Sequence, residues 1–205
     1  SDLLFEVLGS DVFELEDGEV KHFGILWRDR ASGLVMIEIV KQTPVGNRWS
    51  PTGLDIVKSF TKWLARHPAP KWVVTDPATY YTGADFMDFL SRSGVGLTCT
   101  PAEAHYLMGA EEGAIGIAKR IVLKLQKEND KWDVHMLFDM VTHAMNSHIG
   151  SSGFSAYQCV YGKDHHSEPL PDGLEASKAF GGLLKARERA KLEYDKEKAR
   201  DKFSK

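Results

Sequence analysis

The sequence predicts an α/β protein with one mixed β-sheet and helices on both of its faces. Three observations lead to this prediction. The first third contains three apolar stretches of strand length, separated by turn residues. The middle third alternates two short β-branched stretches with helical patterns, and the remainder has helical patterns alone. With 205 residues, of which 42% are hydrophobic, the chain is long enough to bury a core.

The first three strands are expected at residues 6–15, 22–29 and 33–41. The turn EDGE separates the first two strands, and RASG separates the second from the third. Strands that follow one another at such short spacing pair most simply as hairpins. We therefore expect an antiparallel meander.

Two further strands are expected at KWVVTD (71–76) and VGLTCT (95–100), which are short and apolar. A helix beginning at Thr52 has its apolar residues at helical spacing and ends before the two prolines of HPAPK. A second helix, at 83–94, ends at a glycine and lies between the two strands. This alternation predicts a five-stranded mixed sheet covered by helices.

The rest of the chain is predicted to be helical, at 110–127, 132–148, a short helix from Ser155, and a long charged helix at 174–203. From residue 174 onward there are 10 Lys and Arg against 6 Asp and Glu, whereas the whole chain has a net charge of −3. Such a basic tail is typical of an interaction arm or of a solvated helix. We expect a core at residues 1–165, followed by a linker and basic helix at 166–205.

Composition excludes several classes of protein. Cys99 and Cys159 are far apart and have no CxxC partner, so no disulfide framework or cysteine-based zinc site is expected. No apolar run is long enough to span a bilayer, and no membrane is expected as a partner. A reducing intracellular setting fits best.

Three carboxylates occur where strands and helices rarely place them. Asp11 interrupts the first strand, Asp76 ends the fourth strand, and Glu112 lies in the first turn of the helix at 110–127. Taken singly, they are explained by solvation on an edge strand, by a turn, and by the helix dipole. Ligands in open α/β sheets bind beyond the carboxyl ends of strands, so the joint occurrence of the three acids indicates a site.

The order of elements and the spacing of these acids resemble the catalytic core of retroviral and copia-like retrotransposon integrases, which has a ribonuclease H-like fold. Thirty-five residues separate Asp76 from Glu112, as in the family's D,D-35-E motif. HFGILWRDRASGLV, PAEAHYLMG and GFSAYQCVYGKD are similar to segments that follow the first acid, precede the glutamate and follow the last core helix. The resemblance covers Leu8 to Gly162.

The resemblance implies a metal-dependent polynucleotidyl transferase that trims DNA ends and joins them to target DNA. Asp11, Asp76 and Glu112 would be its catalytic residues and the ligands of two Mg²⁺ or Mn²⁺ ions, with Asp11 bridging both. Hard divalent cations prefer such oxygen ligands, and two of them can activate the attacking oxygen and stabilise the leaving one.

The resemblance also implies partners and a location. Lys119 stands at the position of a family lysine that contacts the DNA end, and DNA contacts are expected from Arg120, Lys124 and His105 as well. The partners would be the element's DNA ends, target DNA and further copies of the chain. The protein would act in the nucleus or cytoplasm of a host cell, or within a virus-like particle.

Two alternatives remain open. Ala78 stands where the family commonly has glycine, and Leu107-Met108 replace its usual Gln-Asn, which favours a decayed or host-adopted domain that binds DNA or protein. The second alternative is a ribonuclease H-like nuclease that cuts but does not join. Glu111 lines up with the buried face of its helix, and we expect it to be either a solvated first-turn carboxylate or a perturbation of the site.

Overall fold

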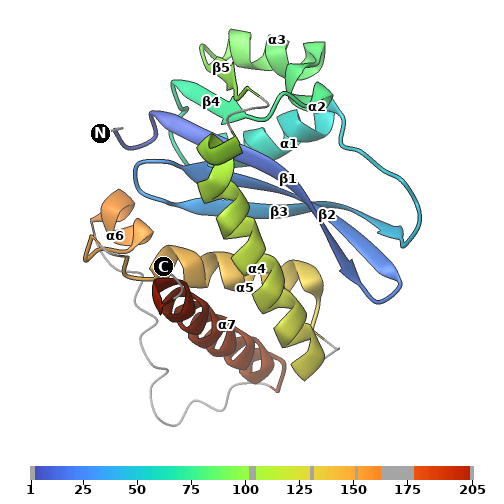
Figure 1. Ribbon diagram of the computed structural model, residues 1–205, viewed down its shortest axis with the longest axis vertical. Coiled ribbons are helices and arrows are strands. Elements are labelled where there is room, and N and C mark those ends of the chain that lie inside the picture. Colours follow the sequence, from blue (N-terminus) through green and yellow to red (C-terminus); the bar gives the residue numbers. More distant parts are fainter. Residues whose placement is uncertain (1–2, 102–104, 130–131, 151, 163–177, 204–205) are drawn as a thin grey trace. The chain divides into compact units, whose positions relative to one another are not determined.

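The computed structural model describes residues 3–101, 105–129, 132–150, 152–162 and 178–203 (Figure 1). The chain forms two compact units, Ser1–Gly116 and Ile117–Lys205. The first unit contains the sheet, and every element described in the second is a helix. The domain boundary expected after residue 165 falls within 163–177, outside the described residues, and stays a prediction.

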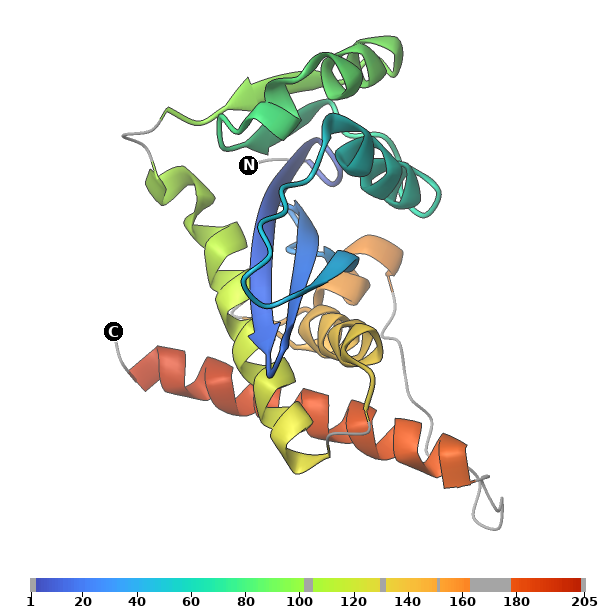
Figure 2. The same ribbon diagram turned by 90° about the vertical axis from the view of Figure 1, so that its right-hand side faces the viewer.

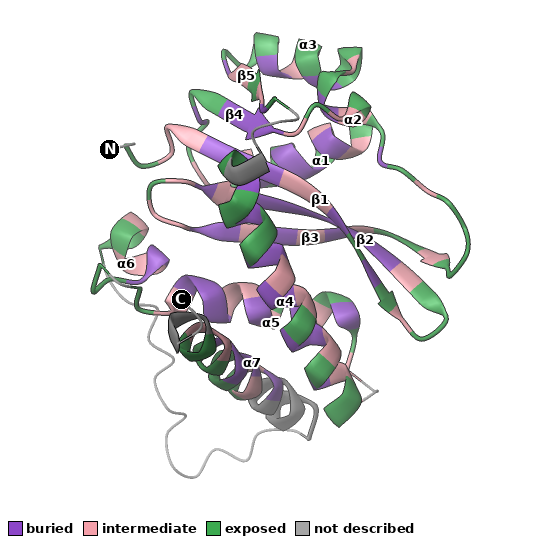
Figure 3. Cartoon of the chain, viewed as in Figure 1, coloured by how far each residue is buried: buried purple, intermediate pink, exposed green. Residues whose placement is uncertain are grey.

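The sheet has five strands in the order β3-β2-β1-β4-β5. Strands β1 (Val7–Asp17), β2 (Val20–Asp29) and β3 (Val35–Pro44) form the antiparallel meander that the sequence predicts. Strand β4 (Trp72–Thr75) pairs in parallel with β1, and β5 (Gly96–Cys99) pairs in parallel with β4. The predicted mixed five-stranded sheet is therefore confirmed, and β2 contributes more buried residues than any other strand (Figure 3).

Three helices of the first unit follow the meander. Helix α1 (Gly53–Leu64) begins at a capping box, in which the Thr52 side chain accepts a hydrogen bond from the Asp55 N–H and the Asp55 carboxylate accepts one from the Thr52 N–H. Helix α3 (Ala84–Arg92) matches the expected helix before β5. A short helix, α2 (Thr79–Thr82), was not expected, because four residues are too few to show a helical period.

The register of the sheet assigns its two faces. Ser10 of β1 lies opposite Trp27 of β2, so both side chains point to one face. There the Trp27 indole N–H donates to Ser59 Oγ of α1 at 2.9 Å, and Ser10 Oγ lies 2.7 Å from the hydroxyl oxygen of Tyr81 in α2. Helices α1 and α2 therefore cover this face.

Large aromatic side chains fill the space between the sheet and α1. Trp27 packs against Phe60 and Phe86, with ring centroids 5.0 and 6.4 Å apart, and all three are fully buried. Burying one such side chain contributes roughly 2–3 kcal/mol. This core holds β1 and β2 in place beneath the opposite face, to which Gly9 and Asp11 point because strand side chains alternate.

Helix α4 (Gly109–Glu128) follows a single 3-10 turn, η1 (His105–Met108), and is one continuous helix (Figure 2). Its first residues belong to the first unit and the remainder to the second. In the first unit, Glu111 lies directly over Gly9 of β1. The start of α4 therefore covers the sheet face opposite α1.

The second unit also contains α5 (Val134–Ser147), α6 (Ala156–Tyr161) and α7 (Lys178–Phe203). Helix α5 packs against α7, and α6 begins at a capping box formed by Ser155 and Gln158. These helices match the predicted ones. None of the helices in the described part of the chain has the length and apolar character needed to cross a membrane.

Candidate active site

Asp11 lies within β1 on the face that α4 approaches. Its carboxylate is partly buried and accepts a hydrogen bond from the Val12 N–H at 2.8 Å. The expectation that Asp11 merely faces solvent on an edge strand is wrong, since β1 is flanked by β2 and β4.

Asp76 comes directly after β4, and the sheet register brings it level with Asp11. Gly9 pairs with Val74, so the same register continued by two residues aligns Asp11 with Asp76. The Asp76 carboxylate accepts a hydrogen bond from the Ala78 N–H at 3.4 Å. The turn expected at Asp76-Pro77 is therefore present, and Asp76 also lines a pocket together with Asp11.

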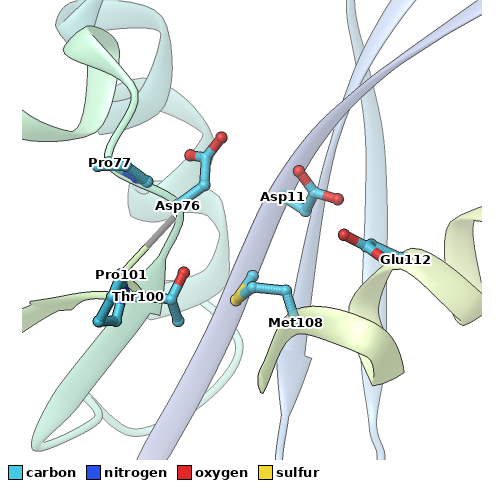
Figure 4. A pocket seen from close by; sticks show the side chains of 7 residues that line it. All are labelled: Asp11, Asp76, Pro77, Thr100, Pro101, Met108 and Glu112. Carbon is cyan, nitrogen blue, oxygen red and sulfur yellow. The ribbon is translucent and has the colours of Figure 1, made fainter. Parts of the chain in front are cut away.

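Glu112 completes a pocket with the two aspartates. It lies in the first turn of α4, is exposed to solvent, and points toward Asp11, while Asp76 lies on the far side of the pocket (Figure 4). The pocket has a volume of about 210 Å³. Its lining consists of the three acids and of Pro77, Thr100, Pro101 and Met108. Strand β1, the residue that follows β4, and helix α4 thus each supply one carboxylate.

The pocket concentrates negative charge. Burial, together with the smaller effect of the charges of Asp76, Glu112 and Glu111, raises the pKa of Asp11 to about 6, against an ordinary value of 3.8. The Val12 N–H opposes this shift. Burial also raises the pKa of Asp76. No cation offsets these carboxylates among the ion pairs of the described residues.

This donor set fits hard divalent cations. Carboxylate oxygens are the ligands that Mg²⁺ and Mn²⁺ prefer, and a bound cation would offset both the burial of the Asp11 carboxylate and the smaller effect of the neighbouring negative charges. In the part of the chain that the structure describes, however, no three Asp, Glu, His or Cys side chains are close enough to share one ion.

A buried pair of hydroxyls supports the strand beneath the site. Ser10 and Tyr81 are both fully buried, and their hydroxyl oxygens lie 2.7 Å apart. Burial raises the pKa of Tyr81 well above its usual range, so this tyrosine stays protonated. Because Ser10 precedes Asp11, the bond ties the acid's own backbone to α2. Sequence reasoning missed this contact.

Glu111 is buried, so the expectation of a solvated carboxylate is wrong. Its side chain has no exposed surface and forms an ion pair with Arg30, whose Nε lies 3.1 Å from Glu111 Oε1. The helical wheel placed Glu111 on the buried face, and this was the only signal in the sequence. Its partner is 81 residues away, and no local pattern identifies it.

The expected DNA-binding residues lie on α4 and η1. Lys119 is partly buried and has no ion-pair partner among the described residues, whereas Arg120 Nε lies 3.0 Å from Glu197 Oε2 of α7. Lys124 forms an ion pair with Glu193, also of α7. His105 begins η1, and its side chain is outside the described ones.

Solved structures with a similar fold come from retroviruses. The catalytic core of HTLV-2 integrase, solved with magnesium in a trimeric form, is 16% identical over 77% of this chain and 97% of its own, with a TM-score of 0.64. The simian T-cell lymphotropic virus intasome in complex with PP2A regulatory subunit B56 gamma gives 18% identity over 86% of this chain and 59% of that chain, with a TM-score of 0.69.

The catalytic core of BIV integrase is 15% identical over 75% of this chain and 92% of its own, with a TM-score of 0.61. No protein-family model matches the sequence, and no curated protein matches it. Such low identities establish a shared architecture. The chain has the ribonuclease H-like fold of retroviral integrase catalytic cores.

Proposed function

We propose that this chain is the catalytic core of a retrotransposon integrase, a metal-dependent polynucleotidyl transferase that acts on DNA ends. One observation carries the proposal. In a chain with the integrase-core fold, acids from β1, β4 and the first turn of α4 line one pocket. Burial raises the pKa of Asp11 and of Asp76, so both carboxylates lie where water solvates their charge poorly.

The three acids have distinct proposed roles. Asp11 would contact both of two divalent cations, while Asp76 and Glu112 would each hold one from opposite sides of the pocket. The magnesium in the HTLV-2 core, which shares the fold, supports this choice of ion. Two such ions, when bound, supply activation of an attacking oxygen and stabilisation of a leaving one.

The protein's own residues would prepare the pocket for this chemistry. Met108 is buried, and with Pro77 and Pro101 it gives the pocket apolar walls beside the acids. Apolar walls exclude water and strengthen the interactions among charged groups. Water would be the nucleophile when a DNA end is trimmed, and a DNA 3′-hydroxyl would be the nucleophile when that end is joined.

Contacts to the DNA backbone are proposed for α4. Lys119 lies two turns after Glu112 on the same helix and is the expected cation with no ion-pair partner among the described residues. Arg120 and Lys124 would have to exchange α7 carboxylates for phosphates. His105 stays a proposed contact. Such contacts give affinity that depends on salt and little on sequence.

We also propose that the protein acts as a homo-oligomer inside a host cell, in the nucleus, the cytoplasm or a virus-like particle. Joining two DNA ends in concert needs at least two active sites. The dimeric and trimeric forms of the HTLV-2 core support an assembly of copies.

A strand-transfer assay tests the proposal. The purified chain is incubated with short duplexes that end in the element's terminal sequence, a target plasmid, and Mg²⁺ or Mn²⁺. Joined products are expected with the wild type, and Asp76→Asn should reduce them at least 100-fold while the circular dichroism spectrum is unchanged. The size of this loss follows from the several kcal/mol of charge stabilisation that bound metal supplies.

The same assay separates the alternatives. Metal-dependent cleavage without joining would reject the transferase and support a nuclease. DNA binding without any cleavage would support a decayed binding domain, for which Ala78 and Leu107 are the sequence observations. If the chain is such a decayed domain, Ala78→Gly should raise activity only if Asp11, Asp76 and Glu112 still bind metal.

A further inference from the structure

The first turn of α4 contains a buried ion pair that the proposed chemistry does not use. The Glu111 side chain has no exposed surface, and its oxygens lie 3.1 and 3.4 Å from Arg30 Nε and Nη2. A carboxylate removed from water is costly unless it is paired and hydrogen-bonded. Arg30 therefore stabilises Glu111 in a position that it could not otherwise occupy.

Arg30 connects three segments around this carboxylate. Its backbone N–H donates to Val7 O at 3.0 Å, which holds Arg30 beside the first residue of β1, the strand that carries Asp11. Its Nη2 donates to Leu107 O at 2.8 Å and lies 3.5 Å from Met108 Sδ, so it also holds the turn that leads into α4. The planar guanidinium holds its N–H donors in a fixed fork, so Nε and Nη2 can contact Glu111 and Leu107 O together.

Gly9 provides the space in which Glu111 lies. A Cβ atom at Gly9 would be 1.9 Å from Glu111 Oε1, a distance at which no real Cβ is found. Asp11 is two residues further along β1 and points to the same face. The Glu111 carboxylate thus rests on the strand directly beside the first acid of the pocket.

This packing determines where Glu112 points. Adjacent residues of an α-helix differ in direction by about 100°, so a helix whose residue 111 is fixed over Gly9 directs residue 112 to one side. In this structure that side faces Asp11 (Figure 4). If Glu111 left Gly9, the first turn of α4 could rotate and Glu112 would lose its direction.

We propose that Gly9, Arg30 and Glu111 form a seat for α4 that positions Glu112 as a metal ligand. Glu111 and Arg30 act through Glu112 and are positioning residues. The role assigned to Glu112 rests on the proposed function, but the seat itself does not. Partners that orient metal ligands typically contribute 10–100-fold to metal affinity.

A double-mutant cycle tests the seat. Gly9→Ala should displace Glu111 and weaken Mn²⁺ binding at least tenfold, measured by titration calorimetry on the full chain. Glu111→Ala removes the carboxylate with which the new methyl would collide. The double variant Gly9→Ala/Glu111→Ala should therefore bind Mn²⁺ no more weakly than Glu111→Ala alone, whereas independent effects would add.

The matched control is Glu128→Gln, which removes another α4 glutamate that forms an ion pair with an arginine, Arg189. It should leave Mn²⁺ affinity unchanged. If Gly9→Ala and Glu111→Ala lower the melting temperature but leave Mn²⁺ affinity of the folded protein unchanged, the pair is only structural and the proposal fails.

Hydrogen exchange separates this proposal from the proposed function. The amides of the first turn of α4 should exchange faster in Gly9→Ala and in Arg30→Met, with or without metal. If the wild type binds no Mn²⁺, the proposed metal centre fails, yet faster exchange at this turn still supports the seat. Unchanged exchange in both variants overturns it.

Discussion

Helix α4 carries ion pairs at both ends, and the two sets are built differently. At its start, Glu111 and Arg30 have side-chain exposures of 0% and 20%. Further along, Arg120, Lys124 and Glu128 each form an ion pair with α7, and the Arg120 and Glu197 side chains are 54% and 16% exposed. Buried pairs are costly to break, whereas exposed pairs contribute little and are screened by salt.

The two kinds of ion pair suit different tasks: a buried pair can fix the position of a helix, and an exposed pair can exchange one partner for another. The buried pair has no ready substitute partner, so it suits a fixed point beside the acid pocket. Arg120 is more than half exposed and can exchange its carboxylate for a phosphate at little cost, whereas Lys124 would leave a Glu193 side chain that is only 3% exposed and retains Lys196 as a partner. The proposed division is thus between a rigid start of α4, which positions an acid, and later turns that bind DNA.

The largest expected effect comes from breaking the buried pair. Arg30→Met leaves the Glu111 carboxylate buried without a partner and should destabilise the protein by about 3–5 kcal/mol. Arg189→Met breaks a pair whose arginine is 39% exposed and should have a far smaller effect. Urea denaturation of both variants measures the two losses. Equal losses would contradict the distinction between the two ends of α4.

A substitution in the acid pocket should change stability by less, and it should stabilise the protein rather than destabilise it. Because the folded-state pKa of Asp11 is raised to about 6 from 3.8, its ionisation disfavours the folded state. This cost is absent below pH 4, grows between pH 4 and 6, and is complete above pH 6. Asp11→Asn should therefore stabilise the metal-free protein by about 1–2 kcal/mol at pH 7.5, after allowance for partial exposure.

Thermal melts at two pH values check this prediction. The gain from Asp11→Asn should be smaller at pH 5 than at pH 7.5, and adding Mg²⁺ should stabilise the wild type but not the variant. A variant less stable than the wild type at pH 7.5 without metal would show that ionisation of Asp11 does not disfavour the folded state.

The smallest expected effect is on DNA affinity, and it concerns the ion pairs between α4 and α7. Glu193→Gln with Glu197→Gln frees Lys124 and Arg120 from α7 and should raise affinity for duplex DNA several-fold. The slope of log affinity against log salt should steepen by one to two. Lys119→Ala should instead make the slope shallower by about one. Fluorescence anisotropy at several salt concentrations measures both, and unchanged slopes would exclude these cations from the DNA contact.

Much of the fold follows from local patterns in the sequence. The alternation in β1 to β3, the turns EDGE and RASG, and the prolines after α1 predict the meander and the first helix. Asp11 could be chosen because it interrupts a strand, and Asp76 and Glu112 because of the spacing that resembles the integrase motif; all three line one pocket. Four-residue α2 was missed because it is too short for periodicity.

The ion pairs that α4 forms with distant parts of the chain could not be predicted from the sequence. Arg30 and Glu111 are 81 residues apart, and Lys124 and Glu193 are 69 residues apart. Each residue alone reads as an ordinary surface charge, and only the folded chain brings the partners together. Sequence reasoning therefore identified three acids that line one pocket, and it missed the long-range partners of the residues on α4.

A Mn²⁺ soak of crystals of the wild-type chain, read by anomalous scattering, tests most directly whether Asp11, Asp76 and Glu112 bind divalent metal ions. The proposed function predicts manganese peaks in the pocket, one between Asp11 and Asp76 and one between Asp11 and Glu112. Asp11→Asn crystals treated in the same way should show neither peak. A pocket without manganese in the wild type, at a concentration that saturates a known Mn²⁺ enzyme, would contradict the claim.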